Sequence, residues 1–264
     1  MITDHLPTVF VSHGAPTLTL EDVPARRFLV GLGSRFRSVK AVLCISAHWN
    51  TRKPTVNAGK TPETIHDFYG FPDELYRIHY PAPGSPDLAS HVQQLLKDTG
   101  IPCEIDTSRG LDHGAWVPLR LMYPGADIPV VQLSIHQSLD PDYHFTLGKA
   151  LTTLREEGVL VLCSGGAVHP LGDPTASIGP GAITENWAVE FNDWLTTAVT
   201  GGDVQSLVNY RHLAPHAERA HPYPDHYMPL LTALGAAGAG GRGSVLHHSW
   251  HLGDLGMDAY AFDT

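Results

Sequence analysis

Short runs of β-branched and apolar residues alternate along this chain with longer amphipathic stretches, and this alternation constrains the fold more than any other feature. Residues 8–11, 42–46, 130–133 and 160–163 are continuous apolar runs that predict strands buried on both faces. Buried strands separated by helices are typical of a sheet covered on both sides. The sequence therefore predicts an α/β fold, a three-layer sandwich with a central, largely parallel or mixed sheet flanked by helices.

Residues 85–99 show the clearest helical pattern. Leu88, Val92 and Leu95 repeat at helical spacing, while Ser85-Pro86 and Gly100 mark the two ends. Further helices are predicted over residues 22–36, 113–122, 141–156, 185–200 and 226–234, and late strands over 244–249 and 259–262. The glycine-rich stretch 235–243 predicts a flexible loop. In such sheets, ligands bind beyond the carboxyl ends of the strands.

Length and charge narrow the classes of protein. With 264 residues, of which 42% are hydrophobic, we expect one domain spanning 1–264. The formal net charge of −10 disfavours a nucleic-acid partner. Residues 1–7 lack the pattern of a secretion signal, and no apolar run is long enough to span a membrane. Cys44, Cys103 and Cys163 lie in or beside apolar runs, which predicts buried reduced thiols and a cytoplasmic location.

Histidine is the unusual component, because its 17 copies equal lysine and arginine together. His13 follows the first predicted strand in Ser-His-Gly-Ala-Pro, and His48 follows the second in Ser-Ala-His-Trp. Taken singly, either could be a core-edge histidine bonded to a carbonyl. Because strand ends hold side chains rigidly and imidazole binds first-row metals well, their shared placement favours two ligands of one ion.

Four more histidines lie in motifs. His113 enters a predicted helix in Gly-Leu-Asp-His-Gly-Ala-Trp, and His169 follows the strand at 160–163; either is suited to be a ligand or a general acid–base. His221 and His226 flank Pro-Tyr-Pro-Asp, and the two prolines delay the next helix until about Asp225. Spacing alone does not choose between them, and a helix cap at Asp225 beside two surface histidines is the alternative interpretation.

Aromatic residues accompany these histidines and are typical of a pocket for a small planar ligand. We expect substrate contacts from His221, Trp49, Tyr69, Trp116 and Tyr227, with Phe68 and Phe71 nearby. A second metal site at His247, His248 and His251 is disfavoured. The sequence has no Gly-x-Ser-x-Gly elbow, Cys-x-x-Cys pair, His-Glu-x-x-His helix or Walker loop.

Together these motifs resemble the class III extradiol ring-cleavage dioxygenase superfamily, and within it the DOPA 4,5-dioxygenase branch. The resemblance rests on Ser12-His-Gly-Ala-Pro16, Ser46-Ala-His-Trp49, Asp67-Phe-Tyr-Gly-Phe-Pro72, Gly110-Leu-Asp-His-Gly-Ala-Trp116 and His221-Pro-x-x-Asp-His226, which occur in the expected order. It implies a single extradiol dioxygenase catalytic domain that uses Fe(II) and dioxygen to open a catechol ring beside its diol. For L-DOPA the product would be a seco-DOPA semialdehyde.

The resemblance also implies roles for five histidines. His13, His48 and His226 match the metal ligands, His169 the catalytic base and His113 a second pocket histidine that contacts oxygen or substrate. A base with a pKa near neutrality suits this reaction. Many relatives have glutamate as the third ligand, so an all-histidine set departs from the usual facial triad and also accommodates Zn(II) in purified protein.

The sequence differs locally from the family pattern, and two other functions remain as alternatives. Cys163-Ser-Gly and Pro170 stand where relatives usually have Gly-Ser-Gly and Asn, which affects the geometry around His169. A zinc-dependent hydrolase would use the same three histidines with an open metal position. A non-enzymatic binding module on this scaffold is the third hypothesis. We expect a monomer or homodimer that binds a small catechol.

Overall fold

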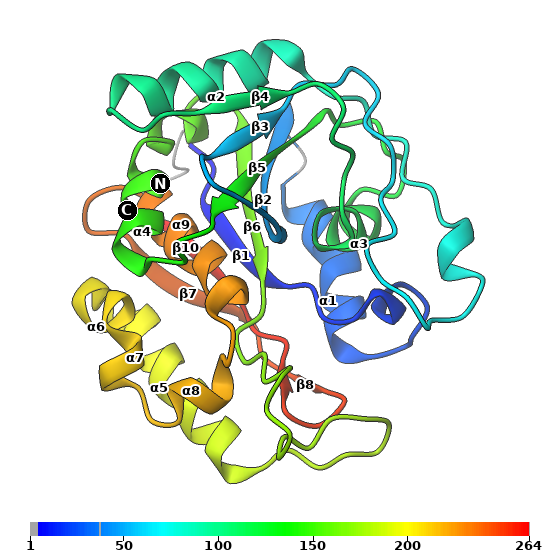
Figure 1. The fold of residues 1–264 in the computed structure, drawn as a ribbon, viewed down its shortest axis with the longest axis vertical. Helices are drawn as coiled ribbons and strands as arrows, with labels where there is room; N and C mark the ends of the chain where they lie inside the picture. The colour runs from blue at the N-terminus through cyan, green and yellow to red at the C-terminus, as the bar shows by residue number, and fades with distance from the viewer. Residues whose placement is uncertain (1–4, 37, 264) are drawn as a thin grey trace.

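An eight-stranded mixed sheet runs through the centre of the molecule (Figure 1), in a computed structural model that describes residues 5–36 and 38–263. Its strand order is β4-β3-β5-β2-β6-β1-β10-β7. The strands are β1 Thr8–Ser12, β2 Ala41–Thr51, β3 Thr55–Asn57, β4 Glu104–Asp106, β5 Val130–His136, β6 Val159–Gly165, β7 Arg242–His247 and β10 Ala259–Asp263. A separate two-stranded sheet pairs β8 Trp250–His251 with β9 Leu255–Gly256.

The centre of the sheet is parallel. Strands β1, β6, β2 and β5 pair in parallel, whereas β10 runs antiparallel to both β1 and β7. The predicted α/β fold and the four predicted central strands are confirmed, and the late strands correspond to β7 and β10. Strands β3, β4, β8 and β9 were not predicted, because segments of two or three residues carry no measurable periodicity.

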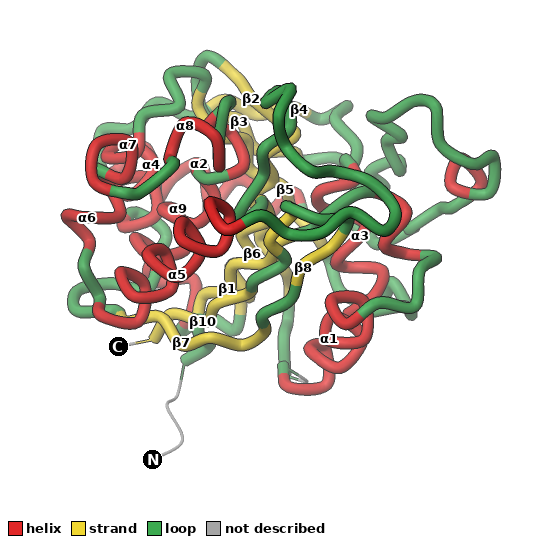
Figure 2. Tube along the Cα trace, turned by 90° about the horizontal axis from the view of Figure 1, so that it is seen from below, coloured by secondary structure: helices red, strands yellow, loops and turns green. Residues whose placement is uncertain are grey.

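Helices cover both faces of the sheet, as Figure 2 shows. The helices are α1 Pro24–Leu32, α2 Pro86–Asp98, α3 His113–Met122, α4 Pro141–Lys149, α5 Asn186–Gly201, α6 Val204–Val208, α7 Tyr210–Leu213, α8 Ala217–Ala220 and α9 Met228–Ala236. Within β1, Val9 and Val11 join the core beneath α1 and α3, while Phe10 joins the core that includes α2, α4, α5 and α9. This alternation explains why the strand is apolar throughout.

Several predicted boundaries were wrong. The helix predicted over 22–36 ends at Leu32 and the one over 141–156 at Lys149, and each is followed by a 3-10 turn, η2 Gly33–Arg35 and η4 Thr152–Arg155. His226 ends the 3-10 turn η5 Pro224–His226, before α9 begins at Met228. The predicted loop starts later than Gly235, which lies in α9. Helices α6, α7 and α8 were not predicted.

Strand β2 is longer than predicted, and its extension carries one of the motif histidines. Pairing with β5 proceeds evenly to Ser46–Ser134 and resumes at Asn50–Ile135, so Ala47, His48 and Trp49 form a bulge. His48 therefore lies within β2 rather than after its end. A bulge re-aims side chains beside a sheet. Here it lies next to the carboxyl ends of β1 and β6.

Other sequence expectations have structural counterparts. Cys44, Cys103 and Cys163 are free and buried, as predicted. Among the described residues, no helix combines the length and the apolar character needed to cross a membrane. Residues 1–4 of the N-terminal segment lie outside the described part of the chain.

Helices α4 and α9 approach so closely that glycine is required at the contact. A Cβ on Gly148 would lie 2.2 Å from the carbonyl oxygen of Thr232, and one on Gly235 would lie 2.0 Å from that of Phe145. Both obstructing atoms are backbone. Movement of a whole helix is the only relief.

We expect Gly148→Ala to destabilise the fold by about 1–3 kcal/mol, the usual cost of overpacking a core. The control is Gly31→Ala in the exposed part of α1, where a Cβ meets nothing within 4 Å; its expected effect is neutral or stabilising by up to about 1 kcal/mol. Urea unfolding of both variants measures the difference. Equal stability of the two variants would contradict the packing argument.

Candidate metal centre

Five of the motif histidines line one cavity at the carboxyl edge of the parallel strands. His13 follows β1, His48 lies in the bulge of β2, and His113 begins α3. His169 follows β6, and His226 ends η5. The cavity has a volume of about 550 Å³ and is otherwise mostly apolar. The sequence-predicted metal and catalytic histidines are thus brought together from across the chain.

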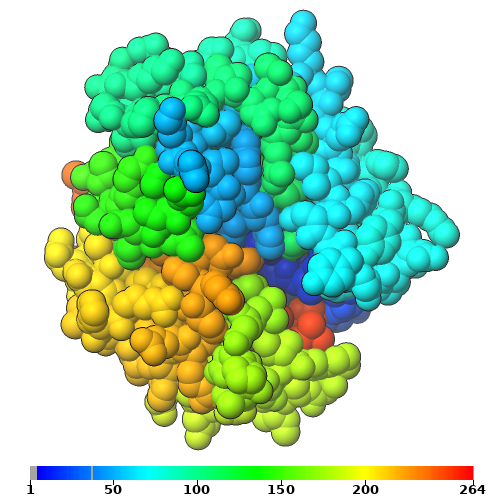
Figure 3. Space-filling view, in the orientation of Figure 1, coloured from blue at the N-terminus to red at the C-terminus, as the bar shows by residue number. Residues whose placement is uncertain are grey.

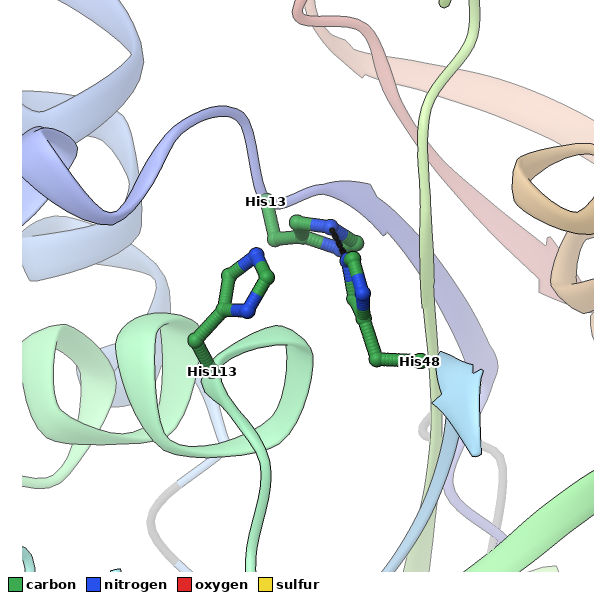
Figure 4. A group of neighbouring side chains, drawn as sticks. All are labelled: His13, His48 and His113. Carbon is green, nitrogen blue, oxygen red and sulfur yellow. Dashed lines mark hydrogen bonds between the residues drawn. The ribbon is translucent and has the colours of Figure 1, made fainter. Parts of the chain in front are cut away.

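The imidazole nitrogens meet at distances suited to a shared ion. Nε2 of His48 lies 2.9 Å from Nε2 of His13 and 3.2 Å from Nε2 of His226. Metal–nitrogen bonds of about 2.0–2.1 Å place neighbouring ligand nitrogens about 3 Å apart. His113 also points into this space (Figure 4), and ligand nitrogens of His13, His48 and His113 all lie within 4.8 Å of one another.

Hydrogen bonds determine which nitrogen of His13 faces the cluster. The Ser164 hydroxyl donates its only hydrogen to the carbonyl oxygen of Gly114 and must therefore accept from Nδ1 of His13, 2.9 Å away. Burial, followed by the neighbouring histidines, lowers the pKa of His13 well below its usual value. His13 is therefore neutral, with an Nε2 lone pair directed at His48.

His226 is oriented in the same way by a carboxylate. Its Nδ1 lies 2.9 Å from Oδ1 of Asp225, which also accepts from the backbone amide of His226. Burial is the main reason that the pKa of His226 falls well below its usual value. The neutral ring donates to Asp225 and presents its Nε2 lone pair to His48, the arrangement of a carboxylate–histidine–metal triad.

The Asp67 carboxylate lies beside two further histidines of the cavity, His48 and His113. Its carboxylate lies 3.6 Å from Nδ1 of His48 and 3.0 Å from Nδ1 of His113, and it accepts the backbone amide of His113 at 2.9 Å. Burial by itself raises the pKa of Asp67, but the hydrogen bonds and charge of His113 outweigh it and lower the pKa to about 2. Burial also lowers the pKa of His48 to about 3. Asp67 therefore stays ionised beside the cluster.

A buried network holds the start of α3 in place. Asp112 caps the helix by accepting from the amide of Ala115, and it also accepts from Ser46 and Arg109. Gln132 donates a further short hydrogen bond to the same carboxylate. Because His113 is the next residue, this network fixes where the imidazole of His113 emerges.

His169 stacks directly on His226. The ring centroids are 3.5 Å apart and the planes differ by 5°. Burial lowers the pKa of His169 to about 4, so the ring is neutral at neutral pH and able to accept a proton. This value lies below the near-neutral pKa that suits the base in the extradiol reaction. His169 therefore lies beside the predicted ligand His226, and its role as catalytic base stays a prediction.

The residues predicted to contact substrate do not line the cavity. Tyr69 is 92% exposed, and Trp49 lies beneath the guanidinium of Arg109. Trp116 is fully buried and donates to the carbonyl oxygen of Ile65. Tyr227 is likewise fully buried, stacked on another tyrosine. Trp49, Trp116 and Tyr227 are therefore engaged in packing or in contacts elsewhere, whereas Tyr69 lies in solvent.

His221 also lies away from the cavity. It is fully buried, donates from Nε2 to the carbonyl oxygen of Ala167 and packs edge-on against Tyr227. The aromatic wall of the cavity comes instead from Phe68 and Phe71. Sequence reasoning missed Ser164 and did not assign a role to Asp67, although Asp67 begins a motif that contains both phenylalanines.

The site can hold a divalent metal. The donors are neutral imidazoles, the ligand set that first-row metals favour, and two of the rings have their second nitrogen fixed by an acceptor. Two carboxylates, Asp67 and Asp225, lie 3.0 Å from Nδ1 of His113 and 2.9 Å from Nδ1 of His226. Fold and site together define an α/β protein with a buried histidine metal centre.

Comparison with known proteins identifies the family. Residues 3–263 match the catalytic LigB subunit of aromatic ring-opening dioxygenase. A protein from Beta vulgaris named 4,5-DOPA dioxygenase extradiol is 45% identical over 97% of this chain and 96% of its own length. A protein of the same name from Escherichia coli K12 is 43% identical over 89% of this chain and 87% of its own.

A solved structure agrees with this match. The crystal structure of an uncharacterized protein from Escherichia coli K12 superposes with a TM-score of 0.80 at 35% identity, covering 97% of this chain and 99% of the other. The chain belongs to the LigB family of class III extradiol dioxygenases. It is an enzyme of the ring-opening dioxygenase class, which confirms the family resemblance of its motifs.

The buried neutral histidines make stability depend on pH. Burial lowers the pKa of His221 to about 3 and of His144 to about 4, from a usual value of 6.5. Below pH 6.5 these two histidines become protonated in the unfolded chain, whereas in the folded chain they stay neutral down to about pH 3–4. Stability is therefore fully present above pH 6.5 and falls as the pH drops through that window, by about 1 kcal/mol per histidine at pH 5.5.

We expect the Tm of the EDTA-treated protein to fall by at least about 5 °C between pH 7.5 and 5.5, since several such histidines act together. Differential scanning calorimetry measures the change. His216→Gln alters a histidine that is exposed and paired with Glu190, so this control should keep the wild-type slope. A Tm that is constant over this range would count against buried neutral histidines.

Proposed function

We propose that this enzyme cleaves the ring of L-DOPA or a related catechol at the 4,5 position, using dioxygen and Fe(II) held by His13, His48 and His226. The observation that carries the proposal is the meeting of three Nε2 atoms, 2.9 and 3.2 Å apart, in the cavity of a LigB-family chain. The relatives from Beta vulgaris and Mirabilis jalapa are both named 4,5-DOPA dioxygenase extradiol, which supports this substrate class.

His226 is favoured over His113 as the third ligand because of its outer hydrogen bonds. His13 and His226 each donate Nδ1–H to a fixed acceptor, which leaves both Nε2 atoms free to bind an ion. Nδ1 of His113 lies 3.0 Å from Asp67 but makes no hydrogen bond among the described residues, so its ring lacks the fixed orientation of a ligand.

His169 and His113 have different catalytic roles in this proposal. Fe(II) held by His13, His48 and His226 would bind the catechol and dioxygen and would make the catechol easier to deprotonate. His169 is neutral and accepts the substrate proton in this proposal. His113 would donate from Nε2 to charge that develops on oxygen, with the Asp67 carboxylate 3.0 Å from its Nδ1.

The cavity walls prepare the substrate for this chemistry. Phe68 lies edge-on to His113 with ring centroids 5.8 Å apart, and Phe71 packs edge-on against Phe68. These rings give a planar catechol apolar surface beside the histidines and exclude water. Exclusion of water strengthens the hydrogen bonds that stabilise developing charge.

The identity of the metal is also part of the proposal. Zn(II) also fits three neutral histidines, and a zinc hydrolase would use the same open position to activate water. The family match favours ring opening over hydrolysis.

We further propose that residues 1–264 act as one catalytic domain in the cytoplasm, as a monomer or homodimer. Three free buried thiols suit a reducing compartment.

Anaerobically reconstituted Fe(II) enzyme is expected to consume oxygen with L-DOPA and form a yellow semialdehyde product. An oxygen electrode and absorbance spectra measure uptake and product together. Zn(II)-loaded enzyme is the control and should consume none, because zinc has no redox chemistry. Absence of uptake across a panel of catechols would refute the proposal.

The proposed roles predict different losses for two substitutions. His226→Ala removes a ligand and should lower the iron content, whereas His169→Ala should keep iron and lower kcat by about 10²–10⁴-fold, as expected for loss of a general base. Metal analysis after gel filtration and steady-state oxygen uptake separate the two effects. Full activity of His169→Ala would favour the binding-module hypothesis over a dioxygenase.

A further inference from the structure

Glu21 is an unexplained charge in the wall of the catalytic cavity. Apart from Glu21 and the histidines, the described residues that line the cavity are uncharged. Many of them are apolar, among them Pro16, Leu171, Ile178, Leu252 and Leu255. A carboxylate in such a wall is costly unless it has a partner or a function. None of the steps assigned to the five histidines uses this group.

The carboxylate is held in place by a histidine from the other end of the chain. Oε2 of Glu21 lies 2.5 Å from Nε2 of His251, a residue of β8 whose side chain is only 5% exposed. Nδ1 of His251 is buried and has no hydrogen-bond partner among the described residues. A single hydrogen on Nε2 avoids an unpaired buried N–H, so the ring donates to the Glu21 carboxylate.

This pair lies close to the metal centre. A Cβ built on Gly14 would be 3.8 Å from Nδ1 of His251, so the His251 ring packs beside the backbone that follows His13. The 3-10 turn η1 Pro16–Thr19 then connects this backbone to Glu21. Glu21 and His13 therefore line the same cavity from one short segment of chain.

Glu21 is more exposed than the buried histidines of the cavity, which matches a substrate with a polar tail. The side chain of Glu21 is 34% exposed, whereas His13 is 1% and His226 4% exposed. Figure 3 shows the surface hollowed between the cyan segment around residues 66–76 and the yellow-green segment around 170–183, with blue and red segments from the two chain ends visible inside. His13, His113 and His226 form the buried end of the cavity, and Glu21 lies at the solvent end.

We propose that Glu21 binds the ammonium group of an amine-bearing catechol and so selects substrates by the charge of their tail. A catechol held at the histidines through its hydroxyls directs its side chain away from them, toward the solvent end. An ammonium group there gains a charge-assisted hydrogen bond, whereas a carboxylate tail is repelled. His251 acts as a positioning residue. The inference rests on the proposed catechol substrate and specifies its tail.

Three catechols that differ in their tails provide the test: dopamine with a cationic tail, L-DOPA with a zwitterionic tail, and 3-(3,4-dihydroxyphenyl)propanoate with an anionic tail. For Fe(II) enzyme, Glu21→Gln is expected to raise the KM for dopamine roughly tenfold, the effect of losing one charged hydrogen bond at a partly exposed site. The kcat should change little, and the KM for the propanoate should stay level or fall. L-DOPA should respond in the same direction as dopamine.

Asp22→Asn is the matched control. It removes the same charge from the adjacent residue, which is exposed and paired with Arg27, so all three KM values should stay at the wild-type level. Equal KM changes for all three catechols in Glu21→Gln would overturn the inference and assign the Glu21–His251 pair a purely structural role. Thermal unfolding of each variant checks that the fold is retained.

Anaerobic calorimetry separates this inference from the proposed reaction. If dopamine binds wild-type enzyme at least about tenfold more tightly than Glu21→Gln, charge selection stands even where no oxygen is consumed. If the wild-type enzyme turns over catechols but binds dopamine and the propanoate equally, ring cleavage stands and charge selection fails. If none of the three catechols binds, both proposals fail.

Discussion

The close approach of neutral imidazoles at the carboxyl edge of the sheet is the constraint on which the site depends. His13 and His226 both direct Nε2 lone pairs at Nε2 of His48, and burial keeps the His13 and His226 rings neutral. His48 can donate its single Nε2 hydrogen to only one of them, whereas a cation at the meeting point would be coordinated by all three rings. The fold supplies the rigidity this requires, because His13 follows a fully buried strand and His48 lies in a bulge whose two ends, at Ser46 and Asn50, both pair with β5.

Much of this arrangement could be predicted from the sequence, and the rest shows where sequence patterns fail. Continuous apolar runs identify buried strands, and histidines at their ends must meet because parallel strands share a carboxyl edge. The bulge around His48 could not be predicted, since it depends on the register with β5. The three-residue strands β3 and β4 are too short for periodicity to reveal.

Side-chain direction is the other property that the sequence pattern does not contain. Tyr69 and Phe71 belong to one motif, yet Tyr69 points into solvent while Phe71 lines the cavity. Trp116 follows His113 by three residues on α3 and is buried in the core, because the same helix must both present a histidine and pack against the sheet. Proximity to a catalytic histidine in sequence therefore says little about contact with substrate.

The carboxylates behind the histidines offer an account of the departure from the facial triad. In the proposed site, His226 would replace the carboxylate of the usual facial triad, and its Nδ1 donates to Asp225. The negative charge would then lie on the far side of the imidazole, where it makes the ring a stronger donor. Asp67 adds a second carboxylate near the cluster, 3.0 Å from Nδ1 of His113 and 3.6 Å from Nδ1 of His48. Such a site retains compensating charge for a divalent ion, while all of its proposed ligand atoms are neutral nitrogens that accept iron and zinc alike.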